Sequence, residues 1–408
     1  MLSKKPLIIR DAIHGDIYLK EDVVIELVNT KEFQRMRRIN QLGGGEFVFP
    51  SATHTRFSHS IGVYCLVDKF FTNEAISSKL TKKQMLLVKI AGLLHDIGHG
   101  PYSHTFEIIN EIRNKPISHE EYSSKIIKDP NGEVYKVLNR YLEDEEIDEI
   151  CQLIQGEHKN DVLNSFVSSQ LDADRLDYLK RDSYFSGVNY SNVDSSYIIR
   201  NSLIVDGKLC VSSKARHSIE HYLISRYHMY MQMYNHKISN GFDTLYLAWW
   251  KRLKELIEKK FPFENVKIVN TLHHFLKDET PINVYLHMDN YAFITYVKIM
   301  MNENDKILKK LSYNLIHRKF HKWKKLTTME AGKLLINFQR EYHTDNNYFI
   351  LHCKKKSYII YSRNEKPIYI YNEKSRELEE LSANSQVLNF DNQKNAGNIA
   401  NEYFVISD

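Results

Sequence analysis

The sequence predicts a mainly α-helical fold that carries two short β-hairpins and a small antiparallel sheet near its C-terminal end. From residue 21 to about residue 260, apolar residues recur mostly at helical spacing, as in KKQMLLVKIAGLL. The segments PLIIRDAIHGDIYL and NSLIVDGKLCVSS each join two extended runs through turn-forming residues, which is typical of a hairpin. From residue 347 onward, NYFILHCKKKSYIIYS and KPIYIYN alternate aromatic or β-branched residues with polar ones, which favours strands.

The same patterns divide the chain into three parts. Residues 1–260 form the predicted helical core, residues 261–345 a helical extension with a loop near 277–281, and residues 346–408 the small β-rich part. The helix that begins at Lys82 is expected to run to about Asp96, because the glycines and the proline of DIGHGP interrupt it there. The Asn- and Ser-rich stretch 382–400 is expected to be partly mobile.

Two charged segments each allow two interpretations. LEDEEIDEI, residues 142–150, is expected to be the solvent-facing side of a helix, with partner binding as the less favoured alternative. HRKFHKWKK, residues 317–325, interleaves cations with aromatic residues. For this second segment we favour a basic surface helix over a site that grips a phosphate backbone.

Composition limits the class of protein. A chain of 408 residues with 42% hydrophobic residues can build a real core, and its net charge of +5 suits an anionic small substrate without indicating a nucleic-acid-coating protein. We expect a cytoplasmic protein with no membrane partner, since no segment resembles a signal peptide or a membrane span. Cys65, Cys151, Cys210 and Cys353 lie far apart without a CxxC pair, which favours core thiols over disulfides or a thiolate zinc site.

The segment LLHDIGHGPYSH, residues 93–104, contains part of a candidate metal site. His95 and Asp96 are neighbours at the expected end of a helix, where successive side chains diverge by about 100°, so a shared ion must lie between their directions. Further ligands must therefore come from elsewhere in the chain. The stretch HTRFSHSIG supplies His59 on a separate helix, with Arg56 one turn earlier on the same face.

An acidic helix expected in SSQLDADRLDYLKRDSYFSG supplies carboxylates. Its residues Asp174, Asp177, Tyr178, Arg181 and Asp182 recur at the spacing of one helical face. A cation would relieve the repulsion between these carboxylates and keep them ionised. Two imidazoles and two carboxylates form a mixed donor set that suits Mn, Fe or Zn, with Mg as a further candidate, and such a site supports hydrolysis.

Each of these motifs is weak by itself. A single histidine in a helix is more often packed or exposed than bound to a metal, and a lone His-Asp pair carries little information. The order of the motifs favours the metal site: a histidine, then His-Asp before a Gly-Pro break, then a distant acidic helix.

The motifs also resemble those of a known family. The HD-domain deoxynucleoside triphosphate triphosphohydrolases contain strings closely similar to RDAIHGDIYL, EFQRMRRINQLGGGEFVFPSATHTRFSHSIGVY, LLHDIGHGPYSH, ISHEEYS and LDADRLDYLKRDSYFSG. This family includes bacterial dGTPase-like enzymes and the vertebrate sterile-alpha-motif/HD enzyme. The similarity runs from about residue 9 to residue 237, and it implies that the helical core is an HD domain.

The resemblance implies a ligand set and a reaction. His59, His95, Asp96 and Asp174 would bind the divalent metal, and Asp172 would be a structural acid. A metal-activated water would attack the α-phosphorus of a dNTP, and the products would be a deoxynucleoside and inorganic triphosphate. The resemblance thus implies that the protein is a dNTP triphosphohydrolase.

Other matching positions imply a substrate site. The candidates for proton transfer are His104 and His119, with His99 nearer the phosphates, because the pKa of histidine lies near neutral pH; for each of them a hydrogen-bonded loop histidine is an equal alternative. The implied phosphate ligands are Arg56, Arg175, Arg226 and Lys237, and the implied sugar or base contacts are Gln41, Leu42, Tyr178, Asp182, Tyr230 and Tyr234. Leu42 and Tyr234 would crowd the 2′ position and exclude ribonucleotides. Arg226, Tyr230 and Tyr234 recur every four residues, so one helix would carry all three.

The resemblance further implies a regulatory site and an assembly. The regulatory nucleotide would contact Asn29, Gln34 and Arg37. Asn29 replaces an acidic residue that reads an activating guanine in the vertebrate enzyme, which implies either another activating nucleotide or constitutive activity. Because relatives assemble to complete such sites, we expect a homo-oligomer, either a dimer or a tetramer.

Two other functions stay open at this point. An HD-type phosphodiesterase or nucleotidase would use the same metal scaffold, and a non-catalytic regulatory protein would bind nucleic acid through residues 317–325. Arg56, Arg175 and Arg226 favour a long polyphosphate over a monoester, and the complete ligand set favours an enzyme.

Overall fold

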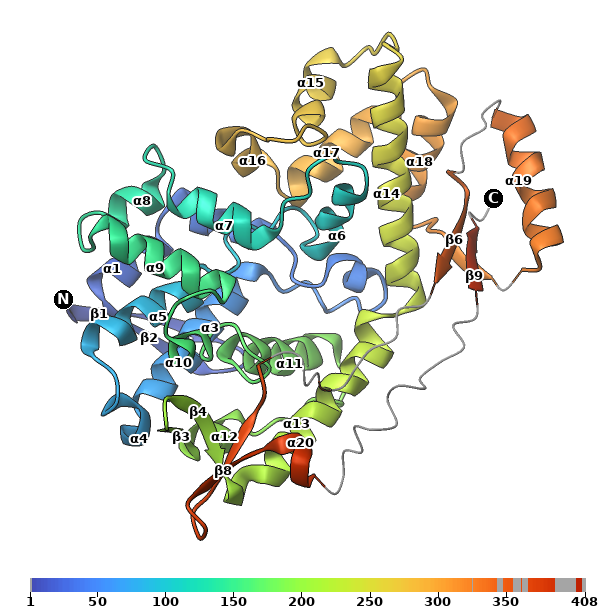
Figure 1. Cartoon of the computed structure of the whole chain (residues 1–408). Helices are drawn as coiled ribbons and strands as arrows, with labels where there is room; N and C mark the ends of the chain where they lie inside the picture. Colours follow the sequence, from blue (N-terminus) through green and yellow to red (C-terminus); the bar gives the residue numbers. More distant parts are fainter. Residues whose placement is uncertain are drawn as a thin grey trace.

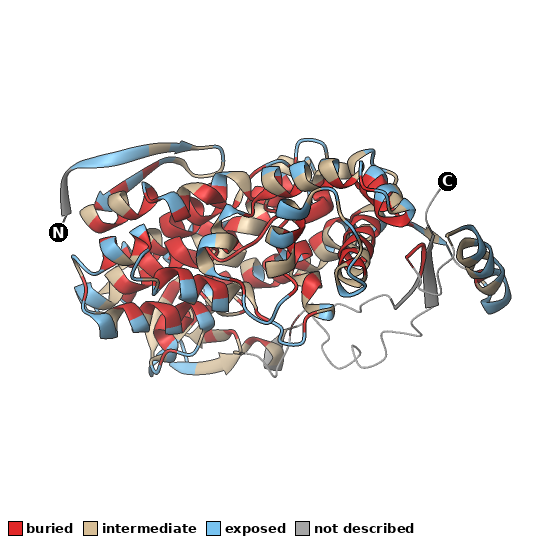
Figure 2. Ribbon diagram, turned by 90° about the horizontal axis from the view of Figure 1, so that it is seen from above, coloured by how far each residue is buried: buried red, intermediate tan, exposed pale blue. Residues whose placement is uncertain are grey.

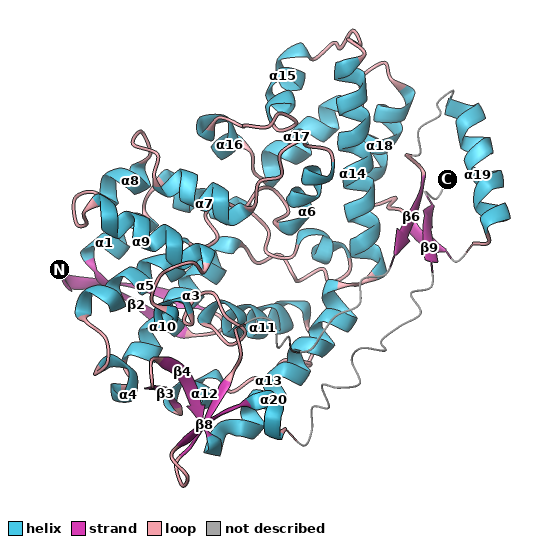
Figure 3. Cartoon of the chain, in the orientation of Figure 1, coloured by secondary structure: helices cyan, strands magenta, loops and turns pink. Residues whose placement is uncertain are grey.

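Helices make up most of the structure, and the strands lie in three small groups around them (Figures 1 and 3). This computed structural model describes residues 2–324, 326–342, 348–354, 361, 366–385 and 401–405. The predicted fold class, mainly helical with short hairpins and small sheets, is confirmed.

The helices follow one another along the chain with short connections. Before residue 100 they are α1 (Asp22–Val28), α2 (Lys31–Arg35), α3 (Arg56–Phe71), α4 (Glu74–Ser77) and α5 (Lys82–Leu94). Up to residue 235 they are α6 (His104–Glu107), α7 (His119–Ile127), α8 (Glu133–Leu138), α9 (Asp144–Gln155), α10 (Asp161–Asn164), α11 (Ala173–Ser186), α12 (Ser195–Arg200) and α13 (Arg216–Met229). The later helices are α14 (Lys237–Glu258), α15 (Val266–His274), α16 (Ile282–His287), α17 (Asn290–Met300), α18 (Lys306–Ile316), α19 (Thr328–Tyr342) and α20 (Leu381–Asn384).

Helix α3 lies at the centre of the part that holds the candidate site. It packs against α5 on one side and α11 on another, and α5 packs in turn against α9. Most side chains of α3 are buried, because apolar or small residues occupy every side of this helix. Figure 2 shows this buried core and, at the far end of the molecule, the largely exposed helix α19.

The close approach of α3 and α11 depends on Gly62. A Cβ atom at this position would lie 2.0 Å from Oδ1 of Asp177 and 2.5 Å from Nη2 of Arg181. Atoms that are not bonded to each other do not come this close. A larger residue at position 62 would therefore force the two helices apart.

Both predicted hairpins are present. Strands β1 (Leu2–Asp11) and β2 (Gly15–Glu21) form the N-terminal hairpin, and β3 (Ser202–Val205) and β4 (Lys208–Ser212) form the second one. Asp206 and Gly207 make the tight turn of the second hairpin with φ values of 49° and 69°. Aspartate and glycine tolerate such left-handed conformations, which explains their position.

The C-terminal strands do not form the single antiparallel sheet that we predicted. Strand β7 (Tyr369–Asn372) pairs in parallel with β4 and in antiparallel with β8 (Glu377–Glu380), which extends the second hairpin into a four-stranded mixed sheet. Strands β5 (Lys322–Lys324), β9 (Asn401–Val405) and β6 (Ile350–Lys354) form a separate antiparallel sheet. Alternation predicts a strand but not its partner, because each partner is chosen by tertiary packing.

Two other expectations about the C-terminal part have different outcomes. Most of the stretch 382–400, residues 386–400, lies outside the described residues. The domain boundaries near residues 260 and 345 stay predictions.

The basic segment 317–325 is not the surface helix that we favoured. Helix α18 ends at Ile316, and the chain continues irregularly into β5. Phe320 is buried, with its ring centroid 4.7 Å from that of Phe47 and 5.3 Å from that of Phe242. His321 is also buried, and its Nδ1 lies 3.0 Å from Oγ1 of Thr244. Burial of these two rings outweighs helix propensity in this segment.

The predictions for the acidic segment, the loop near 277–281 and the buried cysteines agree with the structure. The acidic segment 142–150 contributes the first turns of α9, and the loop near 277–281 separates α15 from α16. Cys65, Cys151 and Cys210 are buried free thiols, and burial raises the pKa of Cys65 and Cys151 to about 11. The side chain of Cys353 lies outside the described residues. None of the helices in the described ranges has the length and the hydropathy needed to cross a membrane.

We expect Gly62→Ala to lower the free energy of unfolding by about 1–3 kcal/mol, because the added methyl group overlaps Asp177 and Arg181. Urea denaturation followed by circular dichroism measures this change. Gly332→Ala in α19 is the control: a Cβ there meets nothing within 4 Å, so alanine should leave stability unchanged or raise it by up to about 1 kcal/mol. Equal loss in both variants would contradict the proposed role of Gly62.

Candidate metal centre and its cavity

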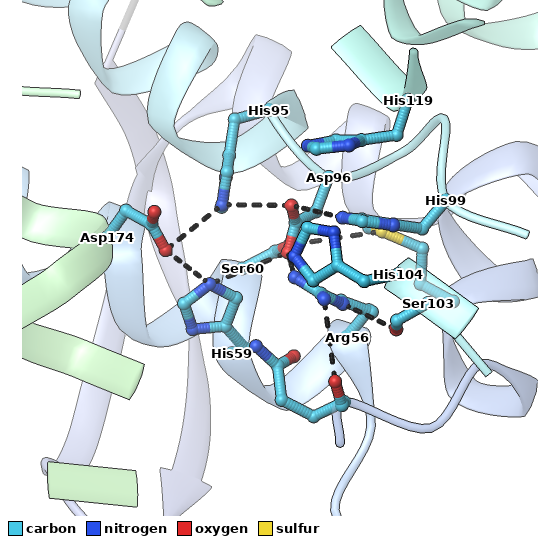
Figure 4. Close-up of polar contacts among 12 residues, drawn as sticks. Arg56, His59, Ser60, His95, Asp96, His99, Ser103, His104, His119 and Asp174 are labelled. Atoms are coloured by element: carbon cyan, nitrogen blue, oxygen red, sulfur yellow. Dashed lines mark hydrogen bonds and ion pairs between the residues drawn. The ribbon is translucent and has the colours of Figure 1, made fainter. Parts of the chain in front are cut away.

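Four side chains from three parts of the chain point toward one position (Figure 4). Nε2 of His59 in α3 lies 2.9 Å from Oδ1 of Asp174 in α11 and 3.5 Å from Oδ2 of Asp96. Nε2 of His95 lies 3.3 Å from Oδ1 of Asp96 and 3.6 Å from Oδ1 of Asp174. The structure therefore brings together all four residues that the sequence analysis selected.

The two histidines present the nitrogen that a metal would need. Nδ1 of His59 lies 2.8 Å from Oδ2 of Asp177, and Nδ1 of His95 lies 2.9 Å from the carbonyl oxygen of Gly92. Each acceptor holds a proton on Nδ1, which leaves the lone pair of Nε2 directed at the centre. Both Nε2 atoms are buried and have no hydrogen-bond partner among the described residues. A divalent cation bound by these nitrogens and the carboxylates would satisfy all four groups.

The backbone after α5 explains the glycines of this segment. Helix α5 ends at Leu94, two residues earlier than predicted, and His95 and Asp96 lie in the turn that follows it. A Cβ atom at Gly98 would lie 2.2 Å from the carbonyl oxygen of His119. Gly98 thus allows the start of α7 to approach the centre, a role that the sequence pattern did not indicate.

The segment then passes through a strained conformation. Tyr102 and Ser103 have φ values of 63° and 56°, which are unfavourable for residues with a side chain. The strain places Oγ of Ser103 where it accepts a hydrogen bond from Nε of Arg56 at 2.8 Å and donates one to the carbonyl oxygen of Asn40 at 2.5 Å. The buried Arg35 donates to the carbonyl oxygen of His99 at 2.9 Å and so holds the same segment from another side.

Asp96 lies between a guanidinium group and an imidazole ring. Nη1 of Arg56 donates to its Oδ2 at 2.6 Å, and Nε2 of His99 lies 3.2 Å from its Oδ1. Burial raises the pKa of Asp96, but the nearby Arg56, His95 and His99 outweigh burial and hold it well below its usual value. Asp96 is therefore an ionised carboxylate at neutral pH, as a metal ligand must be.

A buried network behind His59 was not assigned a role by the sequence analysis. The carboxylate of Asp177 binds His59 and also accepts hydrogen bonds from Arg181, while its Oδ1 lies 2.6 Å from Nε2 of His14. Arg181 in turn donates to Asp11 at 2.8 and 3.2 Å. Burial raises the pKa of Asp177, but Arg181, His14 and His59 lower it well below its usual value. The available signal was the RDAIHGD motif, which carries Asp11 and His14 on the N-terminal hairpin.

A second group of side chains lies beside the metal centre. Rings of His99 and His119 stack with centroids 3.8 Å apart, and those of His99 and His104 lie 4.9 Å apart (Figure 4). Glu107 accepts a hydrogen bond from Nδ1 of His119, and its other oxygen lies 3.4 Å from Nδ1 of His104. Burial, Arg56 and His119 lower the pKa of His99 well below its usual value, so this ring is neutral at pH 7.

Glu107 was also missed, although its spacing three residues after His104 places both on one helical face. The candidate ligand atoms of His99, His104, Glu107 and His119 lie within 4.8 Å of one another, so this group could also hold a metal ion. The bonds that Glu107 already forms with the ring and the backbone N–H of His119 favour a hydrogen-bonded role instead.

A cavity of about 940 Å³ opens onto the centre, near the upper end of the range of roughly 300–1,000 Å³ that small-molecule sites occupy. Of the residues selected from sequence, those that line it are Gln41, Leu42, Arg56, His95, Asp96, His99, His104, His119, Asp174, Arg175, Tyr178, Asp182, Arg226, Tyr230 and Tyr234. His59 is fully buried behind the wall, and the exposed Lys237 does not belong to the lining.

Polar and aromatic groups form one wall of this cavity. The hydroxyl of Tyr234 donates to Oδ2 of Asp182 at 2.7 Å, and Nε2 of His54 lies 2.8 Å from its Oδ1. Arg226 lies near the end of α13, and Tyr230 and Tyr234 belong to the π-helical turn η5 (Tyr230–Tyr234) that continues it. The wider turn replaces the regular helix that the four-residue spacing predicted.

Asp172 and the candidate regulatory residues lie outside the metal centre. Asp172 caps α11 by accepting hydrogen bonds from the backbone N–H groups of Arg175 at 2.8 Å and Ser169 at 2.7 Å. The regulatory candidates Asn29, Gln34 and Arg37 lie around α2 and do not line the cavity. Gln34 accepts a hydrogen bond from Arg37 at 2.8 Å. Their role, the activating nucleotide and the oligomer stay predictions.

Comparisons with known proteins agree with this geometry. The sequence model described as HD domain matches residues 56–182. The uncharacterised protein YwfO of Bacillus subtilis is 30% identical over 351 residues, which cover 84% of this chain and 78% of YwfO. Human deoxynucleoside triphosphate triphosphohydrolase SAMHD1 is 31% identical over 286 residues, 62% of this chain and 45% of the human protein. The crystal structure of the phosphohydrolase BT4208 from Bacteroides thetaiotaomicron superposes with a TM-score of 0.83 at 27% identity and covers 99% of this chain and 100% of that one.

Mn²⁺ should raise the midpoint of thermal unfolding, because a ligand of the folded state adds about 2.7 kcal/mol of stability at 100 times its Kd. Excess EDTA should reverse the shift. Asp96→Asn should lose most of it, since the variant removes a charged ligand. Asp148→Asn is the control, because Asp148 is an exposed partner of Lys128 on the surface. A shift of equal size in both variants would place the cation elsewhere.

Asp177→Asn should weaken Mn²⁺ binding by about tenfold to a hundredfold, because the amide no longer fixes and polarises His59. Isothermal titration with Mn²⁺ measures this change, and far-UV circular dichroism verifies the fold. Wild-type affinity in a folded Asp177→Asn variant would limit Asp177 to a structural role.

Proposed function

The chain belongs to the HD-domain phosphohydrolase family, and from this premise we propose that it is a metal-dependent dNTP triphosphohydrolase. The proposed reaction cuts the bond between the 5′ oxygen and the α-phosphorus and releases a deoxynucleoside and inorganic triphosphate. SAMHD1, a relative over 62% of this chain, carries this activity in its name. The names of YwfO and of the phosphohydrolase BT4208, which span more of the chain, state no substrate, so the dNTP is part of the proposal.

One observation supports this proposal more than any other. A single cavity is lined by three of the four candidate metal ligands, by three arginines and by a wall of tyrosines with Asp182, and the fourth ligand, His59, lies buried behind it. The planar guanidinium group of an arginine can donate two hydrogen bonds to the oxygens of one phosphate. Three arginines in one cavity therefore suit a chain of phosphates better than a single phosphate. The tyrosine wall provides apolar surface and hydroxyls for a nucleoside. A triphosphate joined to a nucleoside matches both halves of the cavity.

The chain's own groups would position the phosphates. Nη1 of Arg175 is buried in the cavity wall and has no hydrogen-bond partner within the described ranges, so it can donate to a phosphate oxygen. Arg56 already binds Asp96 through Nη1, which keeps its positive charge beside the metal centre. A divalent cation, which we expect to be Mn, Fe, Zn or Mg, would supply Lewis-acid chemistry there by neutralising phosphate charge and activating water.

The histidines would donate a proton to the leaving group. Departure of the 5′ oxygen requires a proton, and His104 and His119 both line the cavity beside the metal centre. Glu107 accepts a hydrogen bond from Nδ1 of His119, which fixes the orientation of this ring. The neutral His99 stacked on it would contact the phosphates rather than donate a proton.

Rival functions predict different products or partners. A phosphodiesterase or nucleotidase on the same scaffold would release a single phosphate or pyrophosphate. A nucleic-acid-binding role for segment 317–325 loses support, because Phe320 and His321 are buried and Arg318 donates to the carbonyl oxygen of Phe47 at 2.7 Å.

We expect the purified protein with Mn²⁺ to convert at least one dNTP into deoxynucleoside and inorganic triphosphate, tested by ion-exchange chromatography over a panel of dNTPs and NTPs, alone and in pairs. Asp96→Asn should reduce turnover by at least about a thousandfold, because it removes a cation ligand from the reacting centre. Asp148→Asn should retain wild-type turnover. Release of pyrophosphate or orthophosphate would contradict this proposal and favour a phosphodiesterase or nucleotidase.

Leu42→Ala should narrow the preference for dNTPs over NTPs by about tenfold, because it opens space for a 2′-hydroxyl in the wall that Leu42 shares with Tyr234. The ratio of kcat/KM values for a dNTP and its matching NTP measures this preference. Leu7→Ala, which alters an exposed side chain of the hairpin, should leave the ratio unchanged. An unchanged ratio in Leu42→Ala would mean that the sugar binds in another part of the cavity.

A further inference from the structure

One stretch of the cavity wall comes from residues to which the sequence analysis gave no role. It is formed by Gly156, Ser168, Ser169, Gln170 and Lys366. The first four precede α11, whereas Lys366 belongs to the C-terminal segment just before β7. The segment that leads into the mixed sheet therefore places a cationic side chain, from the C-terminal part of the chain, in the cavity wall.

Lys366 is held in place by its backbone and its side chain. Nε2 of Gln170 donates to the carbonyl oxygen of Lys366 at 2.9 Å. Nζ of Lys366 donates to the carbonyl oxygen of Gly156 at 3.1 Å. Three residues later β7 begins, and its parallel pairing with β4 anchors the segment to the core. Contacts of both its backbone carbonyl group and its side-chain ammonium group thus define the position of this lysine.

Among the residues that the structure describes, no buried acid lies at ion-pair distance from Lys366. Within the described part of the chain, the carboxylate at ion-pair distance is that of Asp161, which lies 3.9 Å away and whose side chain is 84% exposed. An ammonium group has three protons, and the bond to Gly156 uses one of them. The others can be donated to an anion in the cavity.

The neighbouring groups fit a phosphate. Arg175 contributes a buried guanidinium nitrogen without a hydrogen-bond partner among the described residues, and Ser168 and Ser169 contribute to the same wall. The N-terminal end of α11 is already capped by Asp172, so the helix itself is not the anion site. Nε of Arg175 also lies 3.8 Å from Oδ2 of the buried Asp172, which offsets part of its charge. Lys366 therefore adds the positive charge that this part of the wall needs to attract a phosphate.

We propose that Lys366 binds the terminal phosphate of a triphosphate chain whose α-phosphorus lies at the metal centre. This inference rests on the proposed function, which sets the orientation of the substrate. It assigns the C-terminal sheet a part in substrate binding. It also gives the protein a means to distinguish a triphosphate from a shorter phosphate chain, which would end before it reaches Lys366.

The test is isothermal titration of the full chain with inorganic triphosphate and, separately, with pyrophosphate at a fixed Mn²⁺ concentration. Lys366→Gln should weaken triphosphate binding by about tenfold, as for loss of one charge-assisted contact, and change pyrophosphate binding by less than about twofold. Lys366→Arg should restore triphosphate affinity. Lys214→Gln is the matched control, because this exposed lysine lies 3.9 Å from Glu373 and does not line the cavity.

The outcomes separate this proposal from the function on which it rests. If Lys366→Gln binds triphosphate as tightly as the wild type, or loses both ligands equally, the lysine only attaches the C-terminal segment and the proposal is wrong. If Lys366→Gln unfolds at a lower temperature than the wild type, Lys366→Met provides the same comparison with the aliphatic stem retained. Absence of dNTP hydrolysis in the wild type would remove the proposed function, while selective loss of triphosphate binding would still support the subsite.

Discussion

The contact between α3 and α11 is the constraint on which the rest of the site depends. At Gly62 the two helices come so close that the carboxylate of Asp177 and the guanidinium of Arg181 occupy the space of a missing side chain. The same contact places His59 between Asp177 on one side and Asp174 on the other. Helix α11 therefore supplies both Asp177, which orients the imidazole of His59, and Asp174, which would bind the same cation as that imidazole.

Burial of so many charged groups is stable only because each one is paired. A buried carboxylate is costly unless cations and hydrogen-bond donors surround it. Asp177 has Arg181, His14 and His59, and Asp96 has Arg56 and His99. His59 shows the consequence: burial lowers its pKa, but Asp174 and Asp177 outweigh burial and raise it to about 10. A metal binds the neutral imidazole, so a proton and a metal would compete for Nε2 of His59.

Segments without regular structure carry as much of the geometry as the helices do. The turn after α5 contains His95 and Asp96, and the strained backbone at Tyr102 and Ser103 follows it. This strain is held by hydrogen bonds from Ser103 to the side chain of Arg56 and to the loop at Asn40. The hairpin turn that carries His14 supports His59 through Asp177. Distant elements thus fix the site together: the Ser103 segment supports Asp96 through Arg56, and the hairpin turn supports Asp177 through His14.

The sequence by itself determined the elements and most of the chemistry. Helical periodicity located the core helices, and Asp206 and Gly207 marked a hairpin turn, because local spacing contains these features. The ordered motifs indicated His59, His95, Asp96 and an acidic helix, and the family resemblance implied Asp174 as the ligand from that helix. Tertiary structure decided what local spacing does not contain. It paired β7 with β4, buried Phe320 in a segment that looked like a surface helix, and brought Lys366 to the cavity. The physical reason is that strand partners, buried rings and charges that meet across the chain are selected by long-range packing, which no short stretch of sequence specifies.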